Sequence, residues 1–234
     1  GRLPPSGGGR LPRSGGGRLP PSGGGLPGAG ACVFFGTVVS TTCNTGRGKP
    51  AMIKVAVCGV GPMGRMHAQL LKQNPAAQLV AIADVQEELR ARVRTELGVP
   101  TFASGEEMID AGVAAAIWVC APTYLHAPLS IRALKSGHHV FCEKPMALDA
   151  RECRAMIRAA TTADRLLTVG QVLRFWPEYV YLKNAIEAGT FGKLLTLSMV
   201  RLGGVTIGWQ EWFLDEKRGG TQIFDRHIHD TDMT

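Results

Sequence analysis

The sequence contains no apolar run long enough to cross a membrane and no cysteine arrangement typical of a metal site. The apolar stretch at residues 29–39 is well short of the roughly 18–20 residues that a spanning helix needs. The six cysteines form no CxxC pair and show no Cys/His spacing of a zinc site. We therefore predict a cytoplasmic protein with reduced thiols, no bound metal and no membrane association.

Acidic residues are absent from the first 51 positions, and this absence explains most of the positive charge of the chain. The 234 residues carry a net charge of +7, of which residues 1–51 supply +6 from six basic residues. Residues 52–234 hold 20 basic and 19 acidic residues, so this part is nearly neutral. Strong attraction to polyanions is not expected of a neutral domain, and the sequence predicts no nucleic-acid partner.

The N-terminal segment 1–51 lacks the pattern of a folded domain. It contains 15 of the 30 glycines and seven of the 14 prolines, and an eight-residue unit, GRLPPSGG with one variation, repeats from positions 1, 9 and 17. Such a segment buries too little apolar surface to offset its ordering entropy, so we predict a disordered tail. The first methionine is Met52. We interpret the tail as upstream read-through or an expression remnant rather than as a basic interaction arm.

Short apolar strands alternate with helices from residue 52 to residue 170. The predicted strands span residues 53–58, 79–83, 101–102, 114–120, 139–142 and 166–169. The predicted helices span residues 62–73, 86–97, 125–136 and 150–163, with a further short helix after Ser104. Ser104 with Glu107 and Asp149 with Glu152 have the spacing of capping boxes. Strands that are apolar throughout and separated by helices predict an α/β domain with a parallel sheet covered on both faces.

The pattern changes after Gly170. A helix is predicted over residues 177–188, and residues 194–202 alternate between apolar and polar side chains. Alternation is typical of a sheet with one packed and one open face, so we predict a second, open-faced α+β domain over residues 171–234. One strand cannot form a stable sheet, and we therefore expect this domain to be truncated at its C-terminus.

The glycine-rich segment GVGPMG at residues 59–64 lies between the first predicted strand and the first predicted helix. In a GxGxxG turn the first glycine permits the turn, the second lets a pyrophosphate approach the backbone, and the third lets helix and strand pack closely. Asp84 ends the second predicted strand, 20 residues after Gly64. It would accept hydrogen bonds from the adenosine ribose and repel a 2′-phosphate, so the sequence favours NAD over NADP. The predicted cofactor-binding residues of this motif are Gly59, Gly61, Pro62, Met63, Gly64 and Asp84.

Two further polar clusters follow predicted strands, and a third lies near the C-terminus. Cys142-Glu143-Lys144-Pro145 and the APTYLH run at residues 121–126 both come directly after a strand. Gly219 and Gly220 precede Asp225 and His229, whose four-residue spacing places them on one side of a helix. His227 and Asp230 would point elsewhere on that helix.

Together these motifs resemble the Gfo/Idh/MocA oxidoreductase family, and within it the members similar to inositol 2-dehydrogenase. The resemblance runs from Met52 to Thr234 through the stretches GVGPMGRMHA, LVAIAD, APTYLH, ALKSGHHVFCEKP, VLRFWPEY, GTFGKL and GGTQIFDRHIHD. It implies a Rossmann domain over residues 52–170, followed by an open-faced α+β domain that carries the substrate site and the oligomer interface. It also implies a homo-oligomer, a dimer or a tetramer, for the full-length protein.

The resemblance also implies roles for individual residues. Lys144, Asp225 and His229 would form the catalytic set, and Pro145 would follow a cis peptide bond. Thr123, His126 and Glu143 are expected to border the nicotinamide, and Pro122 and Lys144 are also expected to bind the cofactor. The residues expected to contact substrate are Lys144, Arg174, Trp176, Asp225 and His229. Arg226 and Thr231 depart from the family pattern, which leads us to expect apolar residues there.

Oxidation of a secondary alcohol requires an acceptor for the hydroxyl proton and an acceptor for the hydride. His229 is the predicted general base, because the unperturbed pKa of histidine lies near working pH. Lys144 would stabilise negative charge on the reacting oxygen, Asp225 would orient the substrate and the other two side chains, and NAD would take the hydride. We predict an NAD-dependent dehydrogenase for a cyclitol, polyol or sugar. The alternatives are an NAD-binding fragment without turnover and an interaction protein that acts through its basic tail.

Overall fold

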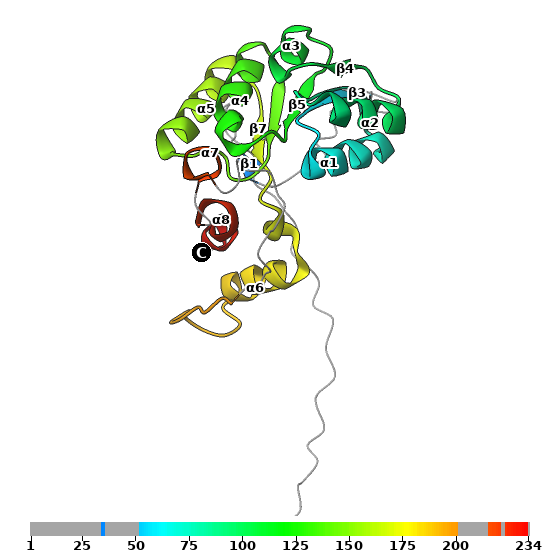
Figure 1. The fold of residues 1–234 in the computed structure, drawn as a ribbon. Helices are drawn as coiled ribbons and strands as arrows, with labels where there is room; N and C mark the ends of the chain where they lie inside the picture. The colour runs from blue at the N-terminus through cyan, green and yellow to red at the C-terminus, as the bar shows by residue number, and fades with distance from the viewer. Residues whose placement is uncertain (1–33, 36–51, 201–214, 221–222, 234) are drawn as a thin grey trace, which may run out of the picture.

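The computed structural model describes residues 34–35, 52–200, 215–220 and 223–233 (Figure 1). Of the tail predicted to be disordered, only Phe34–Phe35 belong to the described residues, as the two-residue strand β1. The other residues of the segment 1–51 lie outside the described residues, and the prediction of a disordered tail concerns this part of the chain.

A parallel sheet forms the centre of the domain, as the apolar strands predict. The strand order is β1-β7-β6-β5-β2-β3-β4, and every neighbouring pair is parallel. The strands between residues 52 and 170 are β2 (Ile53–Cys58), β3 (Ala77–Ala83), β4 (Thr101–Phe102), β5 (Ala116–Val119), β6 (His139–Cys142) and β7 (Leu167–Val169). The order reverses between β2 and β5, and such a reversal is where open α/β sheets bind their ligands.

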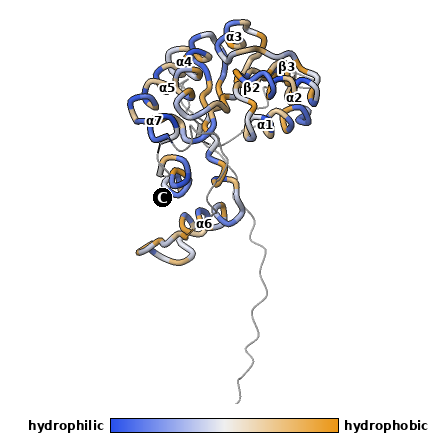
Figure 2. The backbone as a smooth tube through the Cα atoms, in the orientation of Figure 1, coloured by the Kyte–Doolittle hydropathy of each residue, from blue (hydrophilic) through white to orange (hydrophobic). Residues whose placement is uncertain are grey.

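Helices cover both faces of this sheet (Figure 1). They are α1 (Pro62–Gln73), α2 (Glu87–Leu97), α3 (Gly105–Asp110), α4 (His126–Lys135) and α5 (Ala150–Ala163). Val55 and Val57 of β2 are buried with residues of α1 and α2, whereas Ala56 and Cys58 are buried with residues of α3, α4 and α5. Hydrophobic and hydrophilic residues alternate along α4 and α5 (Figure 2). This pattern is typical of amphipathic helices, which pack an apolar face against a sheet and expose a polar face to solvent.

The helix ends follow the predicted local signals. The Ser104 hydroxyl accepts a hydrogen bond from the Glu107 backbone N–H at 3.1 Å, which caps α3. The Asp149 carboxylate accepts one from the Glu152 N–H at 2.7 Å, which caps α5. Both N-cap bonds are therefore confirmed. The reciprocal bonds of the two boxes differ from the usual pattern, because Glu107 accepts from the Ala103 N–H at 3.1 Å and Glu152 from the Leu148 N–H at 3.3 Å, one residue before each cap.

The predicted strand at residues 194–202 is not formed where the structure describes it. Helix α6 (Pro177–Glu187) lies away from the sheet, and residues 194–200 after it have no regular secondary structure. Leu195 is 85% exposed and Val200 is 80% exposed. A strand needs a neighbouring strand for its backbone hydrogen bonds, and the described chain places none beside this segment. The open-faced second domain is thus not seen in the described residues.

Two short elements near the C-terminus lie beside the carboxyl edge of the sheet (Figure 1). They are α7 (Glu216–Gly219) and a π-helical turn, Ile223–His227, that continues into α8 (Ile228–Asp232). Helix α7 contacts the 3-10 turn Thr123–Leu125, which follows β5. A segment about 100 residues later in the sequence therefore returns to the edge at which the predicted site residues lie.

Candidate cofactor and active site

The glycine-rich turn between β2 and α1 is shaped by close backbone contacts. Gly59 has a φ of +85°, and a Cβ on it would lie 2.7 Å from the Ala121 nitrogen. A Cβ on Gly64 would lie 1.8 Å from the Gly59 carbonyl oxygen. At Gly61, by contrast, a Cβ would meet nothing within 4 Å, so the backbone there is open to an approaching group.

The N-terminus of α1 is suited to a phosphate. Pro62 occupies the first turn, and within the described chain no side chain caps this helix end. First-turn amides have no partner inside a helix, and together with the helix dipole they favour an anion. The open backbone at Gly61 and these amides fit the pyrophosphate of a dinucleotide.

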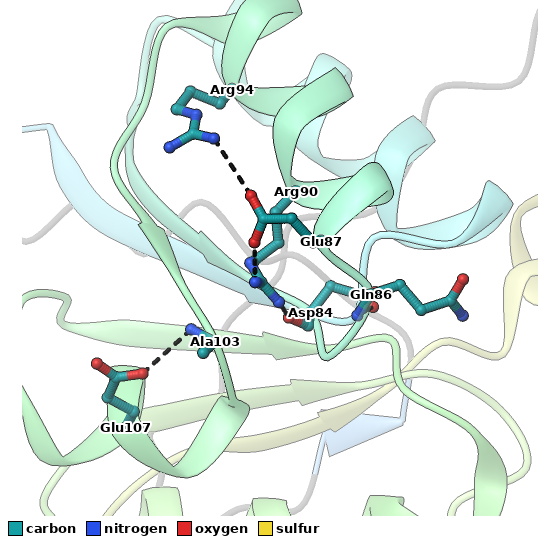
Figure 3. Close-up of polar contacts among 7 residues, drawn as sticks. All are labelled: Asp84, Gln86, Glu87, Arg90, Arg94, Ala103 and Glu107. Carbon is teal, nitrogen blue, oxygen red and sulfur yellow. Dashed lines mark hydrogen bonds and ion pairs between the residues drawn. The ribbon is translucent and has the colours of Figure 1, made fainter.

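Asp84 lies at the end of β3 and holds the glycine-rich turn. Its Oδ2 accepts a hydrogen bond from the Val60 N–H at 2.8 Å, and its Oδ1 accepts one from the Gln86 N–H at 2.9 Å. A carboxylate has about four acceptor sites, so these two bonds leave capacity for ribose hydroxyls. The side chain is partly exposed, and its surroundings include Glu87, Arg90 and Arg94 of α2 (Figure 3).

Glu143, at the end of β6, is fixed by a histidine that the sequence analysis did not single out. The His67 Nε2 lies 2.7 Å from the Glu143 Oε1, and the Lys144 N–H donates to Oε2 at 3.0 Å. Burial raises the pKa of Glu143, but the hydrogen bond and charge of His67 outweigh it, and the pKa lies below its ordinary value. His67 lies three residues after Gly64 on α1, so both residues are on the same side of the helix. Because Gly64 packs against the sheet, this spacing could have indicated that His67 also faces it.

His126 joins the two loops that were predicted to border the nicotinamide. Its Nδ1 lies 2.7 Å from the Pro145 carbonyl oxygen, and its Nε2 lies 2.9 Å from the Ala121 carbonyl oxygen. Burial lowers the pKa of this imidazole, although the two carbonyls oppose the shift. His126 and Thr123 are both buried, whereas Pro122 is partly exposed. The peptide bond before Pro145 is cis, as expected.

Two of the three predicted catalytic residues are in direct contact. The Lys144 Nζ donates to the Asp225 Oδ1 and to the Asp225 backbone carbonyl, each at 2.9 Å. Both side chains are about one-fifth exposed, so the pair faces the solvent-accessible edge. His229 follows in α8, four residues after Asp225, and is 8% exposed. It is therefore more enclosed than the lysine–aspartate pair.

The predicted substrate residue Arg174 forms an ion pair with Asp232 of the same chain. It lies in the turn Val172–Phe175, and its Nε and Nη2 donate to the two carboxylate oxygens of Asp232 at 2.7 Å each. These hydrogen bonds raise the pKa of Arg174. Asp232 belongs to no motif in the sequence, so this partner was missed. Trp176 is half-exposed, and its ring meets that of Tyr179 edge-on at 6.3 Å.

The two residues that depart from the family pattern, Arg226 and Thr231, are not buried. Arg226 is partly exposed and Thr231 is exposed, so neither position demands the apolar side chain that the resemblance predicted. The His227 Nδ1 lies 3.4 Å from the Thr231 hydroxyl. In the described ranges no group of three or more His, Cys, Asp and Glu side chains is arranged to hold a metal, and no helix there is long and apolar enough to span a membrane.

Known proteins share both the sequence and the fold of this chain. It is 35% identical over 183 residues to myo-inositol 2-dehydrogenase of Thermotoga maritima, which covers 77% of this chain and 53% of that protein. It is 33% identical over 187 residues to 2,7-anhydro-N-acetylneuraminate hydratase of Mediterraneibacter gnavus, covering 76% of this chain and 47% of that protein. The chain thus spans about half the length of these relatives, and the two relatives have different activities.

A solved structure shows the same architecture. Scyllo-inositol dehydrogenase from Lactobacillus casei, with bound cofactor NAD(H) and scyllo-inositol, superposes with a TM-score of 0.58 at 27% identity, covering 60% of this chain and 42% of that one. The family described as "Oxidoreductase family, NAD-binding Rossmann fold" matches residues 53–171, which include the glycine-rich turn, Asp84 and Lys144. The chain therefore belongs to the Gfo/Idh/MocA oxidoreductase family and carries its NAD-binding Rossmann domain.

Proposed function

We propose that this chain is the cofactor-binding and catalytic part of a dehydrogenase that oxidises a secondary hydroxyl of a cyclitol, polyol or sugar with NAD. The contact between Lys144 and Asp225 carries this proposal, because it joins the edge of the Rossmann sheet to the segment with His229. A lysine ammonium has three donors, and Asp225 takes two of them within the described chain. The third is available for a substrate oxygen.

The cofactor is held by residues at the switch point of the sheet. The amides at the start of α1 bind the pyrophosphate, and the open backbone at Gly61 lets it approach. Asp84 accepts from the adenosine ribose and repels a 2′-phosphate, so NAD is preferred over NADP. Pro122, Thr123 and Glu143 border the nicotinamide, and His126 positions the loops on either side. When bound, NAD supplies the hydride acceptor.

The polar residues manage the proton of the reacting hydroxyl. His229 accepts this proton as general base, and Lys144 donates a hydrogen bond to the oxygen as negative charge develops on it. Asp225 holds the lysine ammonium in place through its carboxylate and its backbone carbonyl. Trp176 offers an exposed ring to a sugar face, while Arg174 acts by holding α8 through Asp232.

A second candidate is a domain that binds NAD without turnover. It is favoured by one observation, that the described residues include a Rossmann domain but no substrate-binding sheet. Misplacement of a catalytic group by about 1 Å can cost on the order of 10²-fold in rate, so α8 without a supporting sheet could fail to align His229. For both candidates we propose a homo-oligomer and a cytoplasmic location.

Calorimetry and a turnover assay separate these candidates. The chain is titrated with NAD and NADH, and NADH formation is then followed with myo-inositol and a panel of sugars. Binding with turnover supports the dehydrogenase, and binding without turnover supports the second candidate. Absence of NAD binding contradicts both.

A further inference from the structure

We propose that Glu87 is a second determinant of cofactor choice, because it occupies two arginines beside Asp84 that would otherwise bind a 2′-phosphate. The inference rests on the proposed binding of NAD and adds to it. In this view the chain prefers NAD for two reasons. Asp84 repels the phosphate, and the nearby cations that could attract it are already paired.

Arg90 is a cation in direct contact with the turn after β3. Its Nη1 donates to the Asp84 backbone carbonyl at 2.6 Å, and its side chain is only 13% exposed. The guanidinium therefore lies directly against the residue that is expected to bind the adenosine ribose. In dinucleotide-binding folds, an arginine near this position is what accommodates the 2′-phosphate of NADP. A planar guanidinium suits a phosphate because it donates two parallel hydrogen bonds.

Glu87 pairs with this arginine and with a second one on the same helix. Its Oε2 accepts a hydrogen bond from the Arg90 Nη2, and its Oε1 lies 3.5 Å from the Arg94 Nη2 (Figure 3). Positions 87, 90 and 94 follow the helical period, so the three side chains share one side of α2. Figure 3 shows the Glu87 carboxylate between the two guanidinium groups, with Asp84 next to Arg90.

The charges of this cluster cancel. Asp84 and Glu87 carry two negative charges, and Arg90 and Arg94 carry two positive charges. A 2′-phosphate brought to such a cluster meets a carboxylate at Asp84 and gains no uncompensated cation. Neutralising Glu87 leaves one net positive charge and replaces the ion pair at the Arg90 Nη2 with at most a weaker, neutral hydrogen bond, while the bond from Nη1 to the Asp84 carbonyl remains.

The competing explanation is purely structural. Arg90 could serve only to hold the turn after β3, with Glu87 stabilising the first turn of α2, where an acidic side chain is favoured by the helix dipole. Removal of Glu87 would then change the stability of α2 but not the discrimination between the two cofactors. The two explanations therefore differ in the ratio of NADP to NAD affinity.

The test compares Glu87→Gln with a matched control, Glu88→Gln. Glu88 is the next residue of the same helical turn, is exposed, and has no ion pair among the described side chains. Both substitutions remove one negative charge from the start of α2, but only Glu87→Gln removes the ion pair with Arg90. The dissociation constants of NADP and NAD are measured by calorimetry for the unmodified chain, both variants and the double variant Glu87→Gln/Arg90→Gln, and a thermal melt of each confirms folding.

We expect Glu87→Gln to raise the ratio of NADP to NAD affinity about tenfold, which corresponds to roughly one added charge-assisted hydrogen bond. Glu88→Gln should change it by less than about twofold, because an exposed and more distant charge is screened. The double variant should lose the gain. An equal change in Glu87→Gln and Glu88→Gln, or a gain that survives in the double variant, overturns the inference.

The outcome for the unmodified chain separates this inference from the proposed function. If that chain binds NAD and Glu87→Gln gains nothing for NADP, then only the role of Glu87 is wrong. If that chain binds no NAD, then the proposed function is wrong and the inference falls with it.

Discussion

Lys144 and Asp225 are 81 residues apart in the sequence, yet the lysine Nζ donates to both the carboxylate and the backbone carbonyl of the aspartate at 2.9 Å. The lysine comes from the carboxyl end of a buried strand, and the aspartate comes from a π-helical turn outside the sheet. The ammonium group of Lys144 thus links the edge of the sheet to the C-terminal segment. Arg174 and Asp232, 58 residues apart, form a second such link.

Replacement of Lys144 by alanine should reduce turnover while leaving NAD affinity nearly unchanged. The lysine is proposed to stabilise charge on the reacting oxygen, and loss of such a donor typically costs about 10²–10³-fold in rate. Turnover is measured as NADH formation with myo-inositol and a panel of sugars, and NAD affinity is measured by calorimetry. His229→Ala should cut turnover by about 10²–10⁴-fold as the loss of a general base. Undiminished turnover in either variant would show that its assigned role is wrong.

Replacement of Arg174 by alanine should loosen the C-terminal segment. The arginine donates two hydrogen bonds to Asp232, and without them α8 loses this two-point link to the turn Val172–Phe175. We expect faster amide hydrogen exchange across residues 223–233 and unchanged exchange in α5. Lys183→Ala is a suitable control, because its ion pair with Glu187 is exposed and lies within α6. Equal exchange of residues 223–233 in Arg174→Ala and Lys183→Ala would contradict the prediction.

His67→Ala should destabilise the domain more than substitutions elsewhere on α1. It leaves the enclosed Glu143 carboxylate without the imidazole at 2.7 Å, and an unsatisfied buried polar group costs about 1–3 kcal/mol. Arg65, on the same helix as His67, forms an ion pair with Glu96 of α2. Arg65→Ala removes this pair, and an exposed pair is worth about 0–1 kcal/mol. Chemical denaturation measures the free energy of unfolding for each. His67→Gln, which can donate to Glu143, should recover part of the loss, and equal losses in His67→Ala and Arg65→Ala would contradict this account.

Acidification should destabilise the fold partly through His126. Burial lowers its pKa in the folded state below the ordinary 6.5 that it takes in the unfolded chain. Between these two pKa values the unfolded chain binds more protons, so the free energy of unfolding falls as the pH decreases below 6.5. His139, whose pKa burial also lowers, contributes in the same direction.

The measurement is the melting temperature at several values of pH between neutral and mildly acidic conditions. His126→Asn removes the titrating group and keeps one donor, so its melting temperature should fall less on acidification than that of the unmodified chain. If both proteins lose the same number of degrees, then His126 does not contribute to the pH dependence.

The fold between residues 52 and 170 could be predicted because its signals are local. Helices α1 and α5 and strands β2, β4 and β6 begin and end at the predicted residues, and α3 begins after Ser104 as predicted. Capping side chains, left-handed glycines and the apolar pattern of each strand act over a few residues and mark these ends. The predicted strand at residues 194–202 was wrong over the described residues 194–200, because alternation specifies a strand only when a partner strand lies beside it.

The amino-acid sequence by itself determined the order of strands and helices, the glycine-rich turn and the position of Asp84, since each depends on short-range steric and hydrogen-bonding preferences. The tertiary structure decided which distant side chains meet. It turned His126 inward to join two loops, paired His67 with Glu143, and paired Arg174 with Asp232. These contacts depend on how the sheet brings its carboxyl edge, α1 and the C-terminal segment together, and neither spacing nor composition in the sequence encodes such distances.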